Sequence, residues 1–373
     1  MVEVTQGAQK RNFLYDSLGR LIRVKQPEQE INASLNKTDP TTGNSQWTAG
    51  FKYDVVGKLI KSTDAKGVNI INEYDGADRV LKRCYTKPGV STSAQTCSSI
   101  AQPDQSTDTP AVCYKYDLTN GSIQNSKGQL IETSSSVSTS RTSAFDQYGR
   151  PTEYQQITDG TTYTSKYIYN LSGALIEEEY PSGRKVKHEF DPNGDLERVW
   201  GTNGTLNYVY ANGFKYTASG GIERMRLGNG LWETAQFNER LQVTSLGLGH
   251  SVANDNLWKV NYAFGEFDSS GNIDQTKNTG NIAKQTISFS GLTQPFEQEY
   301  RYDSLYRLTE AKEKVNGQQE PNWSQNFGYD RYGNRLSHTK NINGSLVNNT
   351  VLDHPAIDPA TNRIAAGQVS TCR

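Results

Sequence analysis

A short acidic stretch has the spacing of calcium ligands. Asp191, Asn193 and Asp195 alternate in the run Asp-Pro-Asn-Gly-Asp, and oxygen ligands at alternate positions begin a calcium-binding loop. The remaining ligands of such a loop and its terminal bidentate glutamate do not follow in the sequence. Asp191 and Gly194 also fit a repeated turn, which explains both without a metal. We therefore predict no metal site.

Histidines and nucleophiles give no recognisable catalytic motif either. His188-Glu189 lacks the second histidine of the HExxH zinc-peptidase pattern. The chain has no GxSxG motif, and Gly247-Leu248-Gly249 is a lone GxG without a helix signal after it. The four histidines, His188, His250, His338 and His354, are scattered. We predict a protein with no catalytic residue and no cofactor, and a hydrolase with an unrecognised site is the weakest alternative.

Glycines and aromatic residues recur at a fixed spacing. In each copy an aromatic residue is followed by glycine at +4, glycine at +14 and a second aromatic residue at +21. The copies are Tyr53, Gly57, Gly67 and Tyr74; Tyr169, Gly173, Gly183 and Phe190; and Tyr216, Gly220, Gly230 and Phe237. A fourth copy starts at Phe190 and Gly194 and ends one residue early, at Tyr210. This is an internal repeat, and it dictates the fold prediction.

The repeat predicts β-hairpins. An Asp or Asn that ends a strand starts a turn by accepting hydrogen bonds from backbone N–H groups two residues on. A glycine three residues later supplies the positive φ of a hairpin loop made of a type I turn and a bulge. About 7 residues remain between turns, which is a normal strand length. We predict an all-β fold, an antiparallel meander of hairpins in a curved, spiralling single-layer sheet.

A tyrosine-aspartate pair marks many of the turns. The clearest copies are Tyr15-Asp16 with Gly19-Arg20-Leu21 and Tyr53-Asp54 with Gly57-Lys58-Leu59. Looser copies are Phe145-Asp146, Tyr302-Asp303 with Arg307-Leu308, and Tyr329-Asp330 with Gly333. This motif resembles the YD-repeat, or Rhs, family of bacterial Rhs proteins, shell subunits of insecticidal toxin complexes, and animal teneurins. The resemblance implies a β-sheet that forms part of a hollow shell or barrel-like cage, which in several members encloses a C-terminal toxin.

The resemblance does not extend to self-cleavage. In the Rhs family an Asp-Pro-x-Gly-Leu element closes the shell and takes part in autoproteolysis. The nearest matches here, Asp191-Pro192 and Asp358-Pro359, lack the Gly-Leu ending. We therefore expect no autoproteolysis.

Composition agrees with a single-layer sheet. Only 34% of the 373 residues are hydrophobic, whereas tyrosine is abundant, with 21 copies. A sheet wetted on both faces suits tyrosine, which has a large ring and a polar tip. The 39 basic and 40 acidic residues are interspersed, so no nucleic-acid partner is expected. No apolar run reaches ~18 residues, so no membrane span is expected.

The sequence predicts one continuous array over residues 1–373. Two insert loops interrupt it, at 26–50 and 86–112, and the polar first insert should be mobile. Repeats are looser over 243–300, and the tail 341–373 should be weakly ordered. The N-terminus shows no signal peptide, so we expect a fragment of a longer exported protein, secreted or at the cell surface.

Three cysteines lie at the second insert. Cys84 and Cys113 flank it and Cys97 lies inside it. A disulfide between Cys84 and Cys113 is one interpretation, with Cys97 as an alternative partner of either, and three free thiols are the other. The sequence has no CxxC motif and no nearby histidine that would support a zinc site.

Our leading hypothesis is a non-enzymatic shell segment. Its partners would be the remainder of a longer polypeptide and a passenger domain, which the shell encloses. The alternative is an extracellular module that binds carbohydrate or mediates adhesion, with glycans as partners. A cluster of Trp200, Tyr208 and Trp232 on one sheet face would favour that alternative.

Overall fold

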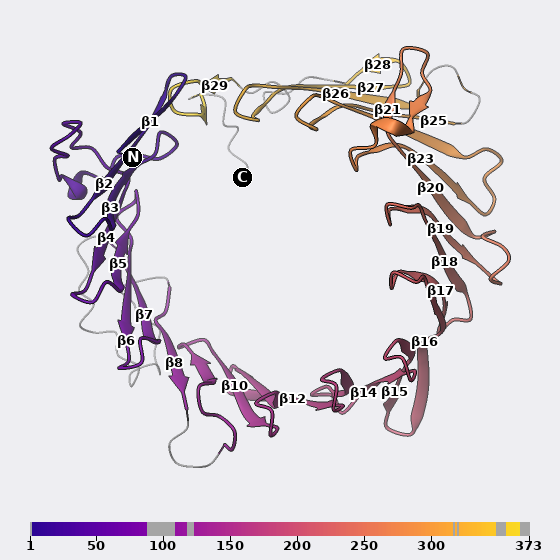
Figure 1. The fold of residues 1–373 in the computed structure, drawn as a ribbon, viewed down its shortest axis with the longest axis horizontal. Coiled ribbons are helices and arrows are strands. Elements are labelled where there is room, and N and C mark those ends of the chain that lie inside the picture. Colours follow the sequence, from indigo (N-terminus) through magenta and orange to yellow (C-terminus); the bar gives the residue numbers. More distant parts are fainter. Residues whose placement is uncertain are drawn as a thin grey trace. The chain divides into compact units, whose positions relative to one another are not determined.

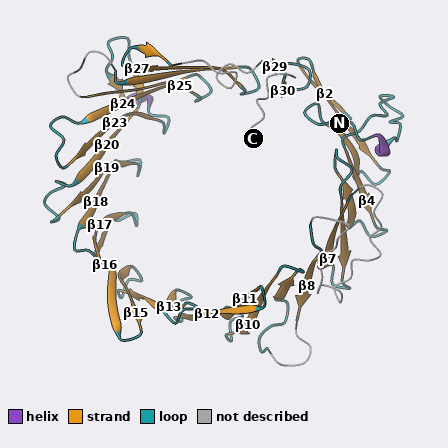
Figure 2. Ribbon diagram, turned by 180° about the vertical axis from the view of Figure 1, so that it is seen from behind, coloured by secondary structure: helices purple, strands orange, loops and turns teal. Residues whose placement is uncertain are grey.

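A computed structural model describes residues 2–87, 109–117, 123–315, 318, 321–347 and 356–365. The chain divides into two compact units. The first comprises residues 1–184 with 358–363, and the second comprises residues 185–357 with 364–373. Figure 1 labels many of the strands in chain order, and Figure 2 shows that strands joined by loops dominate the structure.

The first unit is an antiparallel meander in which each strand pairs with the next along the chain. One short 3-10 helix, η1 (Ala33–Leu35), lies in the connection between β3 and β4. The strands are β1 (Glu3–Gln6), β2 (Gln9–Tyr15), β3 (Leu21–Lys25), β4 (Ala49–Tyr53), β5 (Leu59–Thr63), β6 (Asn69–Tyr74), β7 (Val80–Thr86), β8 (Val112–Tyr116), β9 (Leu130–Ser134), β10 (Ser138–Phe145), β11 (Pro151–Thr158), β12 (Thr161–Tyr169) and β13 (Leu175–Glu179).

The second unit has the same arrangement. Its meander comprises β14 (Lys185–Phe190), β15 (Leu196–Asn203), β16 (Leu206–Tyr216), β17 (Ile222–Leu227), β18 (Trp232–Phe237), β19 (Val243–Gly249), β20 (Trp258–Phe264), β23 (Ile282–Phe289), β24 (Phe296–Tyr302), β25 (Leu308–Val315), β26 (Trp323–Tyr329), β27 (Arg335–Ile342) and β28 (Ser345–Leu346). Two strands near the C-terminus, β29 (Ile357–Asp358) and β30 (Arg363–Ile364), form a small separate sheet. The predicted all-β antiparallel meander is confirmed.

Aromatic residues end alternate strands, and the pairing shifts register beside them. The shift falls next to Tyr15, Tyr53 and Tyr74 in the first unit and next to Tyr302 and Tyr329 in the second. Such a shift is a β-bulge, in which one extra residue on one strand bends the chain. The predicted combination of turn and bulge is therefore observed at successive hairpins.

The sheet buries little over much of its length. Between residues 151 and 242 only Val186 and Gly201 are buried. Most side chains there are half-buried, because neighbours on the same face cover their flanks while no second layer covers their tips. Backbone pairing and cross-strand contacts must therefore hold this stretch together.

The first insert loop packs against the sheet, although its composition predicts a mobile loop. Trp47 has none of its surface exposed, and with Leu14 and Leu35 it forms a buried cluster against which Ile22 packs. The Trp47 indole donates to the carbonyl of Lys37 within the same loop. The polar composition of the loop gives no sign of this packing, in which Leu35 and Trp47 cover one face of the sheet.

The looser repeats over 243–300 have a local cause. The hairpin between β20 and β23 carries an inserted pair of short strands, β21 (Glu266–Phe267) and β22 (Ile273–Asp274), followed by the 3-10 helix η4 (Gln275–Lys277). The main meander passes this insertion by pairing β20 directly with β23. The repeat spacing is therefore lost in sequence while the pairing continues. Within the predicted weakly ordered tail, residues 348–355 and 366–373 lie outside the described residues.

The disulfide prediction needs correction. Cys113 is disulfide-bonded and Cys84 is not. In the register of β7 and β8, Cys113 lies opposite Lys82, so Cys84 is its diagonal neighbour. Diagonal neighbours on one sheet face are about 7–8 Å apart, which is too far for a disulfide. Cys97, the predicted alternative partner, lies outside the described residues.

Candidate functional site

The repeated turns follow one geometry, which Asp16 illustrates. Its backbone N–H donates to the carbonyl of Arg20 at 2.9 Å, and the Gly19 N–H donates back to the Asp16 carbonyl at 3.0 Å. One carboxylate oxygen of Asp16 also accepts the N–H groups of Leu18 and Arg20, both at 3.0 Å. Gly19 has φ of 77°, a conformation that glycine adopts without steric cost. The aspartate side chain thus stabilises the turn by accepting hydrogen bonds from the turn's own backbone N–H groups.

An arginine four residues after the aspartate completes each full turn. The guanidinium Nε lies 2.7 Å from the Asp carboxylate in the pairs Arg20–Asp16, Arg79–Asp75 and Arg307–Asp303, and 2.6 Å in Arg150–Asp146. The backbone N–H of the arginine is the largest cause that holds the pKa of Asp16, Asp75 and Asp303 below the usual value. Burial opposes it with a smaller effect, and the guanidinium then lowers the pKa further. These carboxylates therefore act as hydrogen-bond acceptors within their own turns.

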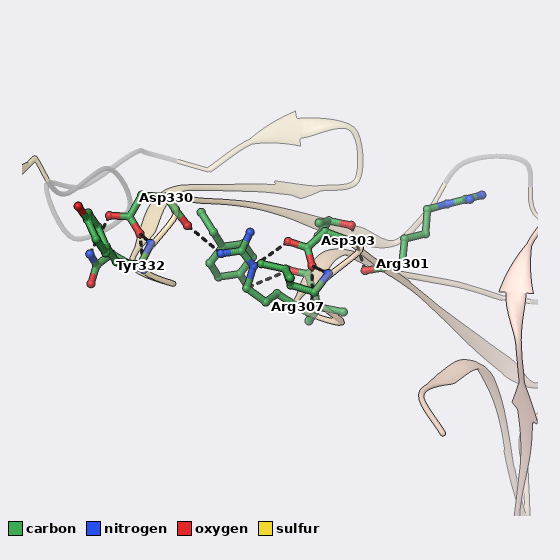
Figure 3. Close-up of polar contacts among 10 residues, drawn as sticks. Arg301, Asp303, Arg307, Asp330 and Tyr332 are labelled. Atoms are coloured by element: carbon green, nitrogen blue, oxygen red, sulfur yellow. Dashed lines mark hydrogen bonds and ion pairs between the residues drawn. The ribbon is translucent and has the colours of Figure 1, made fainter. Parts of the chain in front are cut away.

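The same arginine reaches the next turn at that edge of the sheet. Arg307 donates to the carbonyl of Asp330 at 2.8 Å (Figure 3), and Arg20 donates to the carbonyl of Asp54 at 3.2 Å. Arg150 contacts the carbonyl of Asn170 at 3.1 Å in the same way. Arg79 instead meets the Asp117 carboxylate at 2.6 Å. Each arginine thereby ties two successive hairpins together.

In several motifs the first tyrosine contacts the arginine of the hairpin before it. Guanidinium carbons lie 4.9 Å from the ring centre of Tyr53 and 4.8 Å from the rings of Tyr169 and Tyr329, within the range of a cation–π interaction. The hydroxyl of Tyr53 donates to the carbonyl of Leu21 at 2.9 Å, and the Tyr329 hydroxyl donates to that of Leu308 at 2.8 Å. We call this set of aspartate, arginine and tyrosine contacts the turn network.

Some turns replace a member of the network by another residue of suitable chemistry. Lys58 stands where other copies have arginine, lies 5.5 Å from the Tyr74 ring and pairs with Asp78. Gln242 also occupies the arginine position and exchanges two amide hydrogen bonds with Asn278, at 3.2 and 2.7 Å. The glycine position is held with positive φ by Asp78, Leu241 and Tyr306, at 67°, 61° and 61°. The turn is therefore kept even where its sequence signature is lost.

The structure places the predicted repeat residues at strand ends and turns. The aromatic members end strands, namely Tyr15, Tyr53, Tyr74, Tyr169, Phe190, Tyr216, Phe237, Tyr302 and Tyr329. The acidic members, Asp16, Asp54, Asp191, Asp303 and Asp330, each accept a turn hydrogen bond. The glycines all have positive φ, namely Gly19, Gly57, Gly67, Gly173, Gly183, Gly194, Gly220, Gly230 and Gly333.

The acidic stretch with calcium-like spacing forms an ordinary turn. One carboxylate oxygen of Asp191 accepts the N–H groups of Asn193 at 2.8 Å and Asp195 at 2.9 Å. Among the described residues, no group of three or more His, Cys, Asp or Glu side chains could hold a metal ion. Of the histidines, His188 lies on β14, His338 on β27 and His250 just after β19, while His354 is outside the described residues.

The aromatic cluster that would favour sugar binding is not assembled. Trp200 lies opposite Val209, whereas Tyr208 lies opposite Gly201. Because successive residues of a strand point to opposite faces, Trp200 and Tyr208 are on different faces of the sheet. Trp200 also lies between Lys187 and Arg198, 5.1 and 5.3 Å away, and donates to Glu189 at 2.6 Å. Its ring is thus already in contact with side chains of its own sheet.

Sequence reasoning missed the role of the arginines. Their signal was present, because Arg20, Arg79, Arg150 and Arg307 all stand five residues after the aromatic residue of their turn. No helix among the described residues has the length and apolar character needed to cross a bilayer.

Comparison with solved structures identifies the fold. A crystal structure of TcdB2-TccC3 without its hypervariable C-terminal region matches 95% of this chain, with a TM-score of 0.68 and 15% sequence identity. This chain has the fold of a part of TcdB2-TccC3. The Tc holotoxin pore of Photorhabdus luminescens matches 91% of the chain with a TM-score of 0.63 and 16% identity. A further TcdB2-TccC3 structure matches 90% with a TM-score of 0.63 and 17% identity.

The matched structures are much longer than this chain. It spans 17% of the first two and 18% of the third. No protein-family model matches the sequence, and no curated protein is similar to it. The likeness is therefore one of fold, and at that level it confirms the resemblance to YD-repeat toxin shells.

Proposed function

We propose that this chain is a wall segment of a β-sheet shell that encloses a passenger polypeptide, and that it has no catalytic activity. The observation that carries the proposal is the match of 95% of the chain to TcdB2-TccC3. The turn network supports it, because it commits the recurring Asp, Arg and Tyr side chains to holding hairpins side by side. We infer further that the parent protein is exported.

Confinement is the physical mechanism of such a wall. A single-layer sheet with half-buried, largely polar side chains can keep a polypeptide away from solution without binding it at a specific site. Where the sheet has no covering layer, as over residues 151–242, both faces present mainly polar and tyrosine side chains, with exposed apolar exceptions that include Ile168, Leu171 and Leu206. Such faces offer a passenger few apolar surfaces on which to collapse.

Protease protection tests this proposal. The natural full-length polypeptide that contains this chain would be digested with trypsin under native conditions and after partial opening with urea. We expect the passenger to resist digestion until the sheet unfolds, and then to be cleaved as fast as the isolated passenger. Cleavage of the passenger at its isolated rate under native conditions would contradict enclosure. Specific glycan binding by this chain would support the surface-module alternative instead.

A further inference from the structure

A cavity of about 580 Å³ lies in the first unit beside the first insert loop. Strands β3 to β6 and the turn between β5 and β6 contribute its sheet side, and residues 31–35 of the insert contribute the opposite side. Its volume falls within the usual range for small-molecule sites, about 300–1,000 Å³. The turn network does not account for this cavity, since none of the arginines described above lines it.

The sheet side of the cavity is basic because of strand register. Arg23 lies opposite Gly50, and Lys52 lies directly opposite Lys61. Gly50 and Lys52 are two residues apart on β4, so all three cations point to the same face. Lys66, in the turn after β5, also lines the cavity. Four positive charges therefore surround the space, and no Asp or Glu is among the residues that line it.

None of these cations has a carboxylate partner within the part of the chain that the structure describes. Other lysines of the same sheet do, since Lys58 pairs with Asp78 and Lys82 with Glu73. Like charges directly opposite on a sheet face are destabilising. The Lys52–Lys61 pair therefore carries a stability cost that a bound anion would remove.

The guanidinium of Arg23 is held in place by contacts with its own sheet. Its Nη1 donates to the carbonyl of Ile22 at 2.8 Å, while its Nε is buried and makes no hydrogen bond to any described residue. Gly50 leaves room for this guanidinium, because a Cβ there would lie 3.2 Å from Arg23 Nη1 and 2.8 Å from Leu35 Cδ2. Burial lowers the pKa of Arg23.

The insert side of the cavity is fixed in place by hydrogen bonds. The Asn32 side chain donates to the carbonyl of Asp64 at 2.8 Å, which joins the insert to the turn between β5 and β6. The Asn32 side-chain oxygen accepts the N–H of Ser34 at 3.0 Å. On the sheet side, Thr63 lies opposite Asn69 and donates to it at 2.7 Å. The cavity is thus a formed site with neutral polar groups between its cations.

We propose that this cavity, lined by Arg23, Lys52, Lys61 and Lys66, binds a phosphorylated small molecule. A phosphate group has the several charged oxygens that a cluster of arginine and lysine side chains recognises. A single carboxylate would neutralise only one of the four charges. The cavity also exceeds the size of a free phosphate ion, which leaves space for an organic group. The inference does not depend on enclosure of a passenger.

Pyrophosphate is a suitable probe for the test. The full chain would be titrated by isothermal calorimetry at low ionic strength, and its thermal midpoint measured with pyrophosphate and with sodium chloride of equal ionic strength. We expect saturable binding, weaker at high salt, and a midpoint raised by pyrophosphate but not by sodium chloride. Absence of saturable binding, or an equal shift with both salts, would overturn the proposal.

Lysine variants separate a formed site from general charge effects. Lys52→Gln and Lys61→Gln should each weaken pyrophosphate binding at least tenfold, while the ligand-free midpoint stays equal or rises because the opposed charges are relieved. Lys58→Gln is the matched control. Lys58 directly precedes β5, the strand that carries Lys61, has the same charge and does not line the cavity. Its affinity should stay within twofold of wild type. Equal losses in all three variants would count against the site.

Discussion

The stretch from residue 9 to residue 50 and the stretch from 151 to 242 are built from the same hairpins but are stabilised differently. In the first, an insert loop covers one sheet face and buries Leu14, Leu35 and Trp47 together. In the second, only Val186 and Gly201 are buried, and each hairpin depends on backbone pairing, bulged turns and contacts with its neighbours.

The difference shows that a hydrophobic core is a local addition to this fold and not its foundation. Hairpins of the second kind persist without one because a side chain at successive turns, namely Asn170, Asp191 and Thr217, accepts the backbone N–H four residues on. Where an insert adds a second layer, burial becomes complete and a ligand-sized cavity forms beside it. Complete burial and the cavity that we propose as a binding site therefore occur together, at the insert.

Among the variants that compare the two stretches, Trp47→Ala should lower the free energy of unfolding most. Removing a fully buried tryptophan costs about 3–5 kcal/mol of unfolding free energy, and the insert loop loses its anchor. Urea unfolding followed by circular dichroism would measure it. Trp200→Ala in the uncovered stretch is the control and should cost about 1 kcal/mol or less, as a cross-strand contact does. Equal losses would remove the distinction between the two stretches.

Gly173→Ala tests how far the uncovered stretch depends on its turns. Gly173 has φ of 95° with only the end of the Arg150 side chain near a built Cβ, so the cost is backbone strain of about 1–2 kcal/mol. Gly76→Ala is the matched control, because a Cβ there meets open space and its φ is not positive. It should be neutral or stabilise by about 0.4–1 kcal/mol. Thermal unfolding that fails to separate the two would contradict this account.

Arg307→Lys probes the link between successive turns. Lysine keeps the charge but loses the forked geometry that joins Asp303 to the Asp330 carbonyl. Because Arg307 is about a quarter exposed, we expect a loss of about 1 kcal/mol. The reverse change, Lys58→Arg, should gain a few tenths of a kcal/mol. Both are measured by urea unfolding, and a loss in the reverse change would show that the network does not favour arginine.

The smallest expected effect is the pH dependence of the stability that each turn aspartate contributes. The N–H groups of Arg20 and Arg307, with smaller help from their guanidinium groups, lower the pKa of Asp16 and Asp303. A lowered folded-state pKa gives stability that is present above the unfolded value of about 3.9 and is lost as pH falls through the folded value. The urea midpoint should thus be flat near pH 6 and fall below about pH 4.

Asp16→Thr supplies the comparison for that pH dependence. It copies the turn at Thr217, where a hydroxyl accepts the N–H of Gly221 at 2.9 Å without a titrating group. The variant should lose part of the acid sensitivity of the wild type. An unchanged pH profile would show that this carboxylate does not couple turn stability to pH.

The positions of turns and strand ends were predictable from sequence because they depend on residues a few positions apart. The spacing of Tyr53, Gly57, Gly67 and Tyr74 was sufficient, since positive φ and turn hydrogen bonds are local properties. The arginine contacts were not predictable in the same way. Arg20 meets Tyr53 only because the hairpins stack in chain order, and their 33-residue separation includes an insert of irregular length.

The errors have a common physical origin in tertiary context. Trp47 lies in a polar run, so composition predicted a mobile loop, and only the sheet face beneath it explains its burial. The cysteine prediction depended on the register of β7 and β8, where a difference of two residues separates Cys84 from Cys113. The basic cavity depended on register in the same way, since it places Lys52 opposite Lys61.

Five motif tyrosines donate their hydroxyl to a carbonyl of a strand that precedes them in the chain, namely Tyr53, Tyr74, Tyr216, Tyr302 and Tyr329. During synthesis from the N-terminus, that acceptor leaves the ribosome before its donor does. Each new hairpin can therefore dock on one that is already complete, so the sheet can grow in the direction of translation without waiting for distant segments.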